Sequence, residues 1–381
     1  MCKEKRLYMK KILIHSMYPA PYRVEIYEQL RKYFDCDVFF STSGGDDRKS
    51  GWFLKGNYYL LDDSRGSSYY QECIKNILRY NLVMLYEYSD RNAVKLILAC
   101  KRKKIHYSIN CDGVMLFHHG NFIKELLKRY LVSGATACLA SGEHAKQYFL
   151  KYGAKEENIY FHPFTALHES DILKAPVLPA EKAKLRKHLN LPQNVKICIA
   201  VGRFIPLKRY DILLRLWANM PENTYLLLIG GGPEKETYEK IIREKQLQNV
   251  ILDDFHPFSE LLDYYKASDL FIHPTSYDVW GLVINEAMAC GLPVVVTDTC
   301  VAGLELIRNG ENGYVTHLGD DADFLAKINK ILSNDFLRER MAQNAVETIQ
   351  PYSMENMVAS QMKTIEKVLS EHETTNNRKR R

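Results

Sequence analysis

Two cations, Arg203 and Lys208, stand close together in the segment VGRFIPLKRYD, which ends a predicted strand and leads into a predicted helix. Ligands of parallel α/β sheets bind at the carboxyl ends of the strands, and the first N–H groups of a helix carry partial positive charge. The two side chains therefore suit a diphosphate leaving group, because the negative charge of the diphosphate needs neutralising as its bond breaks. Two ordinary surface cations at a turn remain the alternative.

Two carboxylates follow in the segment FIHPTSYDVWGLVINEAMACG. Asp278 lies in a predicted loop after a strand, and Glu286 lies on the helix that Gly281 opens. Seven residues separate them, so both can face the same edge of the sheet. Carboxylates accept hydrogen bonds from hydroxyl groups, and the pair suits a sugar and a ribose. The alternative for Glu286, a solvated helix residue, is disfavoured because its helical neighbours are apolar.

Two further turns have weaker signals. Backbone N–H groups near Ala302, Gly303 and Leu304 are expected to cradle phosphate oxygens. Gly230 to Gly232 indicate a structural turn, with the border of a nucleotide site as the alternative, and they lack the spacing of a dinucleotide or Walker motif. Asp321 and Asp323 form a D-x-D pattern, but it falls where a helix cap belongs. We therefore expect no metal site.

The elements that carry these residues alternate short apolar strands with helical patterns, twice along the chain. Continuous apolar strands between helices indicate parallel sheets covered on both faces. We expect a first domain over residues 1–170, a proline-rich, charged linker over 171–190 and a second domain over 191–350. Residues 351–381 are expected to form a helix that packs back on the first domain, followed by a basic tail.

Composition limits the class of protein. The chain has 381 residues, with 46% hydrophobic and 26% charged, which is typical of a globular protein. It contains no apolar run long enough to span a membrane. The nine cysteines form no C-x-x-C pair and are expected to be free thiols in the cytoplasm. The net charge of +6 comes with local basic runs and no nucleic-acid-binding motif, so nucleic acid is not an expected partner.

Four segments of the second domain, GRFIPLKRYD, LLIGGGPE, DVWGLVINEAMACGLPVVVT and AGLELIRNGENGYV, together resemble the family-4 glycosyltransferases. The resemblance covers residues 195–316. It implies the GT-B architecture, which is an α/β fold of two Rossmann-like parallel-sheet domains facing across a cleft. The first half is similar to a bacterial subgroup that builds surface polysaccharides, through MYPAPYRVEIYEQL, CDGVMLFHHGNFIKELLKRYLVSGA and YGAKEENIYFHPFTAL.

The resemblance implies a retaining, metal-independent transfer of a hexosyl-type sugar from a nucleotide-sugar donor, without a cofactor. Arg203 and Lys208 match the pair that holds the donor diphosphate, and Glu286 matches the second glutamate of the family's E-x7-E motif, which contacts the ribose. Asp278 replaces the first glutamate and is expected to contact the donor sugar, with a side chain one methylene shorter. The remaining expected donor contacts are Gly202, Gly281, Leu282, Ala302, Gly303 and Leu304.

The first domain is expected to bind the acceptor, a glycan or a lipid-linked glycan. Where the family often has a glycine-rich loop, this chain has Tyr18 to Tyr22. Arg23, Asp112 and His118 are candidate acceptor or sugar contacts, as is the adjacent His119. A structural role is an equal alternative for each of these side chains.

The predicted helix from Asn121 to Val132 mixes cations with leucines. We hypothesise that it docks on anionic lipid at the inner face of the membrane; the alternative is an amphipathic helix whose leucines lie in the core. Two other functions stay open for the whole chain. One is a GT-B nucleotide-sugar epimerase or hydrolase, and the other is a non-catalytic scaffold that binds a nucleotide sugar.

Overall fold

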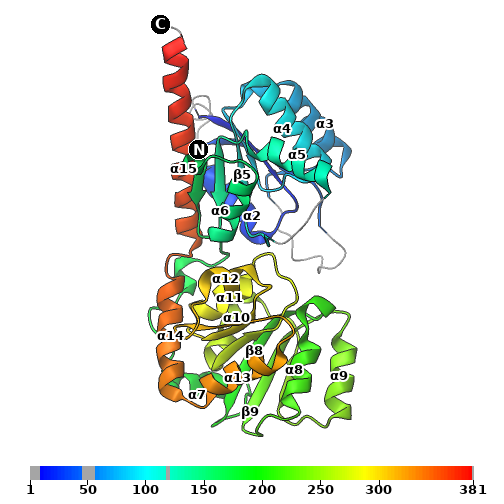
Figure 1. Cartoon of the computed structure of the whole chain (residues 1–381), viewed down its shortest axis with the longest axis vertical. Helices are drawn as coiled ribbons and strands as arrows, with labels where there is room; N and C mark the ends of the chain where they lie inside the picture. The colour runs from blue at the N-terminus through cyan, green and yellow to red at the C-terminus, as the bar shows by residue number, and fades with distance from the viewer. Residues whose placement is uncertain (1–8, 45–55, 117–120, 380–381) are drawn as a thin grey trace. The chain divides into compact units, whose positions relative to one another are not determined.

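The computed structural model describes residues 9–44, 56–116 and 121–379. It divides into two compact units (Figure 1). The first unit comprises Met1–Phe164 with Met354–Arg381, and the second comprises Thr165–Ser353. Each unit is built around its own parallel sheet.

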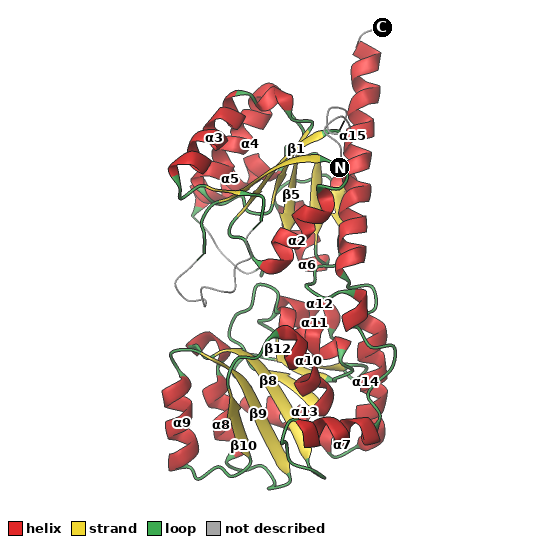
Figure 2. Ribbon diagram, turned by 180° about the vertical axis from the view of Figure 1, so that it is seen from behind, coloured by secondary structure: helices red, strands yellow, loops and turns green. Residues whose placement is uncertain are grey.

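The first unit contains a seven-stranded sheet in the order β3-β2-β1-β4-β5-β6-β7, and every paired strand is parallel. Its strands are β1 (Lys11–Ser16), β2 (Asp35–Phe40), β3 (Tyr59–Leu60), β4 (Leu82–Leu85), β5 (Tyr107–Cys111), β6 (Ala137–Ala140) and β7 (Ile159–Phe161). Its helices are α2 (Pro21–Leu30), α3 (Ser64–Lys75), α4 (Arg91–Lys103), α5 (Phe122–Val132), α6 (Glu143–Lys151) and α15 (Met354–Lys379). Helices α3 and α4 cover one face, and α2 and α15 lie on the other (Figure 2).

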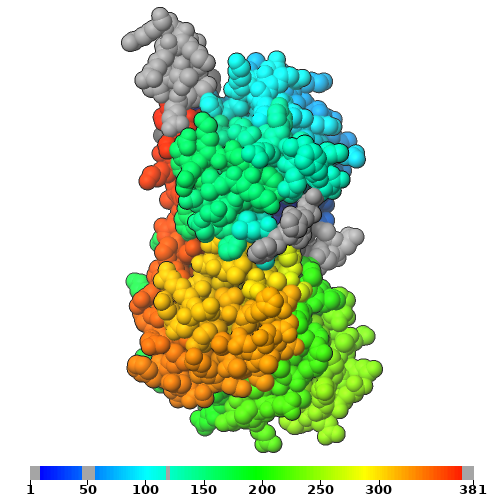
Figure 3. Space-filling model, viewed as in Figure 1, coloured from blue at the N-terminus to red at the C-terminus, as the bar shows by residue number. Residues whose placement is uncertain are grey.

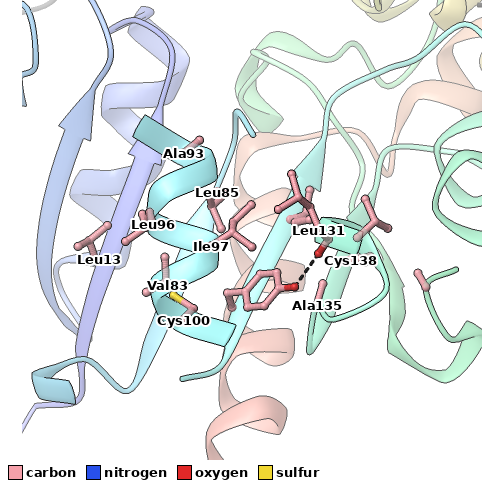
Figure 4. Close-up of a cluster of buried hydrophobic side chains, with 14 of the residues drawn as sticks. Leu13, Val83, Leu85, Ala93, Leu96, Ile97, Cys100, Leu131, Ala135 and Cys138 are labelled. Atoms are coloured by element: carbon pink, nitrogen blue, oxygen red, sulfur yellow. Dashed lines mark hydrogen bonds between the residues drawn. The ribbon is translucent and has the colours of Figure 1, made fainter. Parts of the chain in front are cut away.

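The core of the first unit is made where α4 packs on the strands (Figure 4). Leu96 and Ile97 of α4 are fully buried among the strand residues Leu13 and Val83. The hydroxyl of the buried Tyr107 donates to the carbonyl of Leu131 at 2.6 Å, which ties the end of α5 to the sheet. The unbroken apolar strands of the sequence are explained by this two-sided burial.

The second unit contains a six-stranded sheet in the order β10-β9-β8-β11-β12-β13, again with parallel pairs. Its strands are β8 (Lys196–Arg203), β9 (Thr224–Gly231), β10 (Val250–Asp253), β11 (Leu270–His273), β12 (Val294–Thr297) and β13 (Gly313–Thr316). Its helices are α7 (Pro179–His188), α8 (Tyr210–Trp217), α9 (Lys235–Glu244), α10 (Phe258–Ala267), α11 (Leu282–Ala289), α12 (Val301–Leu306), α13 (Asp321–Leu332) and α14 (Asp335–Ile349).

The strand order of the second sheet reverses at β8, which pairs with β9 on one side and with β11 on the other. Ligands of such sheets bind outside the carboxyl ends of the strands at this reversal. Arg203 ends β8 and His273 ends β11, so both lie at that position. The fold thereby brings together the two segments that the sequence singled out.

The segment 171–190, expected as a linker, differs from that expectation. It contains α7, which contacts α10 in the second unit. Buried Arg186 of α7 pairs with Asp269 at 2.7 Å, and Lys182 donates to the same carboxylate at 2.9 Å. The charges that suggested a solvated linker instead fix α7 to its unit.

The C-terminal helix α15 starts at Met354 and contacts α2 and β6 of the first unit. Among the described helices, none combines the length and the apolar character that crossing a membrane requires. The eight cysteines in the described part of the chain are all free.

Candidate functional site

Lys208 and Asp278 form an ion pair at the strand-order reversal of the second sheet. The Lys208 Nζ lies 2.5 Å from the Asp278 Oδ2, and the side chains are 15% and 20% exposed. Lys208 ends the short helical turn Pro206–Lys208 after β8, and Asp278 lies in the loop after β11. Two hydrogen bonds connect these segments. Thr275 Oγ1 and the Ser276 N–H both donate to the carbonyl of Leu207, at 3.0 and 2.8 Å.

His273, the last residue of β11, is the third member of this cluster. Its Nε2 lies 3.2 Å from the same Asp278 Oδ2, and its side chain is fully buried. Burial of the imidazole and the nearby charge of Lys208 lower the pKa of His273. A neutral imidazole and an ionised carboxylate require that Nε2 carries the proton and donates it to Asp278.

The carboxyl of Asp278 is held in its charged form. Burial by itself raises the pKa of a carboxyl, but the hydrogen bond from His273 and the charge of Lys208 outweigh it and lower the pKa of Asp278 to about 2. The site thus holds one fixed negative charge beside one fixed positive charge.

The loop that carries Asp278 is bound to the start of α12 through its backbone. Asp278 forms a parallel bridge with Cys300, with the Asp278 N–H donating to Thr299 at 3.0 Å and the Val301 N–H donating to Asp278 at 3.2 Å. Gly281 completes the turn with a φ of +100°, and a Cβ there would lie 2.6 Å from the Cys300 sulfur. The position therefore requires glycine, and Leu282 follows it as the first residue of α11.

This arrangement corrects the predicted phosphate cradle at two of its three N–H groups, those of Ala302 and Leu304. The N–H of Ala302 donates to the carbonyl of Trp280 at 2.8 Å, and that of Leu304 donates to Cys300 at 3.1 Å. Both donors already have backbone acceptors and are not directed at a ligand. Gly303 packs on Val296, where a Cβ would lie 2.7 Å from a methyl carbon of that side chain. These residues hold the Asp278 loop in place.

Glu286 lies on α11 with a different partner. The hydroxyl of buried Tyr265, on α10, donates to its Oε2 at 2.8 Å. Burial raises the pKa of Glu286 to about 7, although the tyrosine hydrogen bond acts in the other direction. Glu286 is therefore a largely desolvated carboxyl with one satisfied oxygen, a state suited to a hydroxyl ligand.

Arg203 and Gly202 end β8 beside Lys208. A Cβ on Gly202 would lie 3.8 Å from the Lys208 Cε and 2.8 Å from the hydroxyl of Tyr210. Arg203 is half-buried as a residue and is the last residue of β8. The turn from Gly230 to Gly232 packs against this strand end, since the carbonyl of Gly202 lies where a Gly230 side chain would stand.

Three possible metal ligands, His273, Asp278 and Cys300, lie within 4.8 Å of one another. The chemistry of this set does not favour a cation. Lys208 already donates to the Asp278 oxygen that such an ion would use. Burial raises the pKa of Cys300 to about 12, which keeps its sulfur a thiol, and the thiolate is the form that binds metals.

In the first unit, Arg23 of α2 forms an ion pair with Asp112, which follows β5. The Arg23 guanidinium is buried and lies 4.5 Å from the ring centroid of Tyr86. Two of the expected first-domain contacts are thus joined to each other. His118 and His119 lie outside the described residues.

Sequence reasoning missed His273 and Tyr265. A signal existed for His273, because a polar residue ends an otherwise apolar strand. None existed for Tyr265, which is one of two adjacent buried tyrosines on α10 and reaches Glu286 only in the folded chain.

Two parallel α/β units with these sheet orders define the GT-B fold. The structure is similar to that of HepE from Anabaena in complex with UDP, with a TM-score of 0.74 and 19% identity over 94% of this chain and 100% of that one. It is also similar to a glycosyltransferase from Rickettsia africae, with a TM-score of 0.72 and 18% identity over 95% and 99% of the two chains.

Residues 181–348 match the family model described as glycosyl transferases group 1. The second unit therefore belongs to the glycosyl transferases group 1. A D-inositol 3-phosphate glycosyltransferase of Thermomonospora curvata is 28% identical over 249 residues, which are 59% of this chain and 55% of the relative. The lipopolysaccharide core biosynthesis glycosyltransferase LpsE of Rhizobium meliloti is 31% identical over 170 residues, 43% of this chain and 47% of the relative. The chain spans about half the length of these two relatives.

Proposed function

We propose that this chain is a retaining glycosyltransferase that moves a sugar from a nucleoside-diphosphate donor to a glycan or lipid-linked glycan in surface polysaccharide synthesis. The observation that carries the proposal is the Lys208–Asp278 ion pair at the ligand-binding edge of the second sheet, within the segment that matches the family model. The proposal is further supported by the names of the relatives and by the UDP bound in the similar structure of HepE.

Lys208 acts on the leaving group in this proposal. The bond between the anomeric carbon and the diphosphate oxygen breaks, a bond to the acceptor hydroxyl oxygen forms on the same face, and the hydroxyl proton departs with the nucleoside diphosphate. Negative charge grows on the diphosphate during this step, and a fixed ammonium stabilises it more than it stabilises the intact donor. Arg203, from the end of β8, supplies a second positive charge.

The two carboxyls have separate tasks. Asp278 orients the Lys208 ammonium, which donates to its Oδ2. The Asp278 carboxylate also accepts hydrogen bonds from hydroxyls of the donor sugar. Glu286 contacts the ribose of the nucleotide, with Tyr265 fixing one of its oxygens. Asp278 thus recognises the transferred part of the donor, and Glu286 recognises the part that stays behind.

The donor and the role of Lys208 are tested together. Thermal-shift screening against UDP, GDP and ADP sugars identifies the donor, since a ligand at 100 times its Kd stabilises a protein by about 2.7 kcal/mol. With that donor, Lys208→Ala is expected to lower kcat about 10²–10³-fold and to raise KM less. Lys240→Ala is the matched control, because Lys240 pairs with Glu244 at 3.7 Å on α9 of the same unit and its side chain is 68% exposed.

A Lys208→Ala enzyme with full kcat contradicts the proposed chemistry. Donor consumption at the full rate without any acceptor contradicts transfer and favours hydrolysis or an internal rearrangement.

Metal independence is part of the same proposal. Lys208 donates a hydrogen bond to the Asp278 oxygen that a divalent ion would bind. Its ammonium provides the positive charge that other transferases obtain from such an ion. Activity with the correct donor and acceptor is therefore expected to persist in excess EDTA. Complete loss in EDTA that magnesium or manganese restores is the contrary result.

A further inference from the structure

Helix α5 exposes large apolar side chains along most of its length. The exposed fractions are 74% for Phe122, 73% for Ile123, 52% for Leu126, 41% for Leu127 and 51% for Tyr130. Only Leu131 and Val132, in the last turn, are buried in the domain. The alternative, in which the leucines of this helix lie in the core, therefore does not hold for Leu126 and Leu127. In Figure 3 the turquoise atoms of this segment are part of the visible surface.

The exposed residues form one stripe. Successive helical residues are rotated by about 100°, so positions 122, 123, 126, 127 and 130 fall within an arc of about 140°. Val132, which is buried, points to the opposite side of the same helix. We call the five exposed residues, together with Lys124 and Arg129 that flank them on either side, the α5 face. Helix α5 thus turns one apolar side away from its own domain.

Cations surround the stripe. Lys124 and Arg129 are exposed at its two edges, and Lys128 is half-buried. Arg102, Lys103 and Lys104, at the end of α4, are also exposed. They adjoin α5 because the neighbouring Lys101 donates to the Tyr130 carbonyl at 2.6 Å and lies 4.0 Å from the Tyr130 ring centroid.

The acid within α5, Glu125, does not cancel this charge at the surface. It pairs with Lys128 at 3.3 Å and accepts a hydrogen bond from Tyr152, so it faces the domain. The solvent side of the α5 face and the adjoining end of α4 therefore present positive charge around apolar side chains.

We propose that the α5 face docks on an anionic lipid surface, with its apolar stripe in the interface and its cations on the headgroups. A helix that is apolar on one side and lined with Lys and Arg lies in the plane of such an interface. Charge complementarity favours anionic lipid, because each cation adds about fivefold to the affinity near such a surface. Docking rests on the α5 face alone; its use, to meet a lipid-linked acceptor, rests on the proposed function.

Vesicle co-sedimentation of the full chain, without donor or acceptor, tests the docking. We expect binding to vesicles of equal parts phosphatidylcholine and phosphatidylglycerol, and much weaker binding to phosphatidylcholine alone. The binding is expected to fall as salt rises from about 0.1 to about 1 M, which shortens the screening length from about 10 Å to about 3 Å. Equal binding to both vesicle types, or no binding to either, overturns the proposal.

Paired variants separate the α5 face from general surface effects. Leu126→Glu with Leu127→Glu is expected to weaken vesicle binding at least tenfold, whereas Phe336→Glu leaves it unchanged although Phe336 is 75% exposed on α14. Lys124→Glu with Arg129→Glu is expected to weaken it about 25-fold or more. Lys240→Glu with Arg243→Glu, exposed on α9, is the matched charge control. Equal effects from both members of either comparison overturn the proposal.

Two further measurements test for self-association and for folding of the variants. Sedimentation velocity without lipid detects a second copy of the chain bound to the α5 face. Lipid docking is overturned if the chain is a dimer that the leucine variants convert to a monomer and if it does not bind vesicles. The donor-induced thermal shift is expected to be unchanged in the α5 variants, which shows that they are folded. Vesicle binding without any nucleotide binding leaves the docking intact and refutes the proposed function alone.

Discussion

The carboxylate of Asp278 accepts two hydrogen bonds at a single oxygen, from Lys208 and from His273. Aspartate is one methylene shorter than the glutamate of the motif that this segment resembles. The short side chain still reaches both partners because its loop is bound to Cys300 on one side and to Leu207 on the other. A side chain held in this way is preorganised, which is what charge stabilisation during a reaction requires.

Calorimetry with the free nucleoside diphosphate separates the roles of the two carboxyls. Asp278→Asn is expected to impair transfer and to keep nucleotide affinity nearly unchanged, because the free nucleotide carries no sugar for Asp278 to bind. Glu286→Gln is expected to weaken the same nucleotide about tenfold or more at pH 8, where the carboxyl is charged, since a hydrogen bond to a charged group contributes about 1.5–3 kcal/mol. Nucleotide binding that is lost in Asp278→Asn and kept in Glu286→Gln contradicts the assignment.

At the scale of elements, the ends of β8 and β9 approach each other too closely for a side chain. Gly202 pairs with Gly230 in the register of these strands. Gly230 has a φ of +154°, and a Cβ there would lie 1.9 Å from the carbonyl oxygen of Gly202. The glycines of this turn therefore support the strand end that carries Arg203, and their role is structural.

Gly230→Ala is expected to destabilise the protein by about 2–4 kcal/mol, because the clash involves backbone and adds to the strained φ. Gly310→Ala is the control: its φ is +83°, but nothing lies within 4 Å of the added Cβ, so only backbone strain of about 1 kcal/mol is expected. Thermal unfolding of both variants measures the difference. Equal losses of stability contradict the close approach of the two strands.

At the scale of the whole molecule, Glu286 links stability to pH. Its pKa is about 7 in the folded chain, against 4.5 as its ordinary value. Folding thus favours the neutral form of Glu286. The free energy of unfolding contains this contribution in full below pH 4.5 and loses it as the pH rises to about 7. The loss amounts to roughly 3 kcal/mol above that range.

Glu286→Gln removes the titration, because the amide stays neutral. The Tm of the variant relative to the parent is therefore expected to be higher at pH 8 than at pH 5, by roughly 5 °C or more. Glu244→Gln, at an exposed position of α9, provides the baseline. A pH-independent difference between the Glu286→Gln variant and the parent contradicts a desolvated carboxyl at this position.

The sequence by itself determined the fold class, the alternation that produces both sheets, and the segments that form the candidate site. The reason is that these features are locally encoded. Unbroken apolar runs such as the one over β8 specify buried parallel strands, and Arg203 and Lys208 follow that run directly. The reversal of strand order after β8 then brings β11 beside it, and with it the loop that carries Asp278.

Only the tertiary structure decided which partner each side chain has. Lys208 and Asp278 are 70 residues apart, and Glu286 is 21 residues from Tyr265, so no local pattern specifies either contact. The same holds for backbone donors: the sequence around Ala302 is that of a phosphate-binding turn, but in the folded chain the Ala302 N–H donates to the Trp280 carbonyl. The leucines of α5 follow helical spacing whether they face a core or a membrane. Their exposure depends on which side of the helix the rest of the domain covers, and that is a property of packing between distant segments.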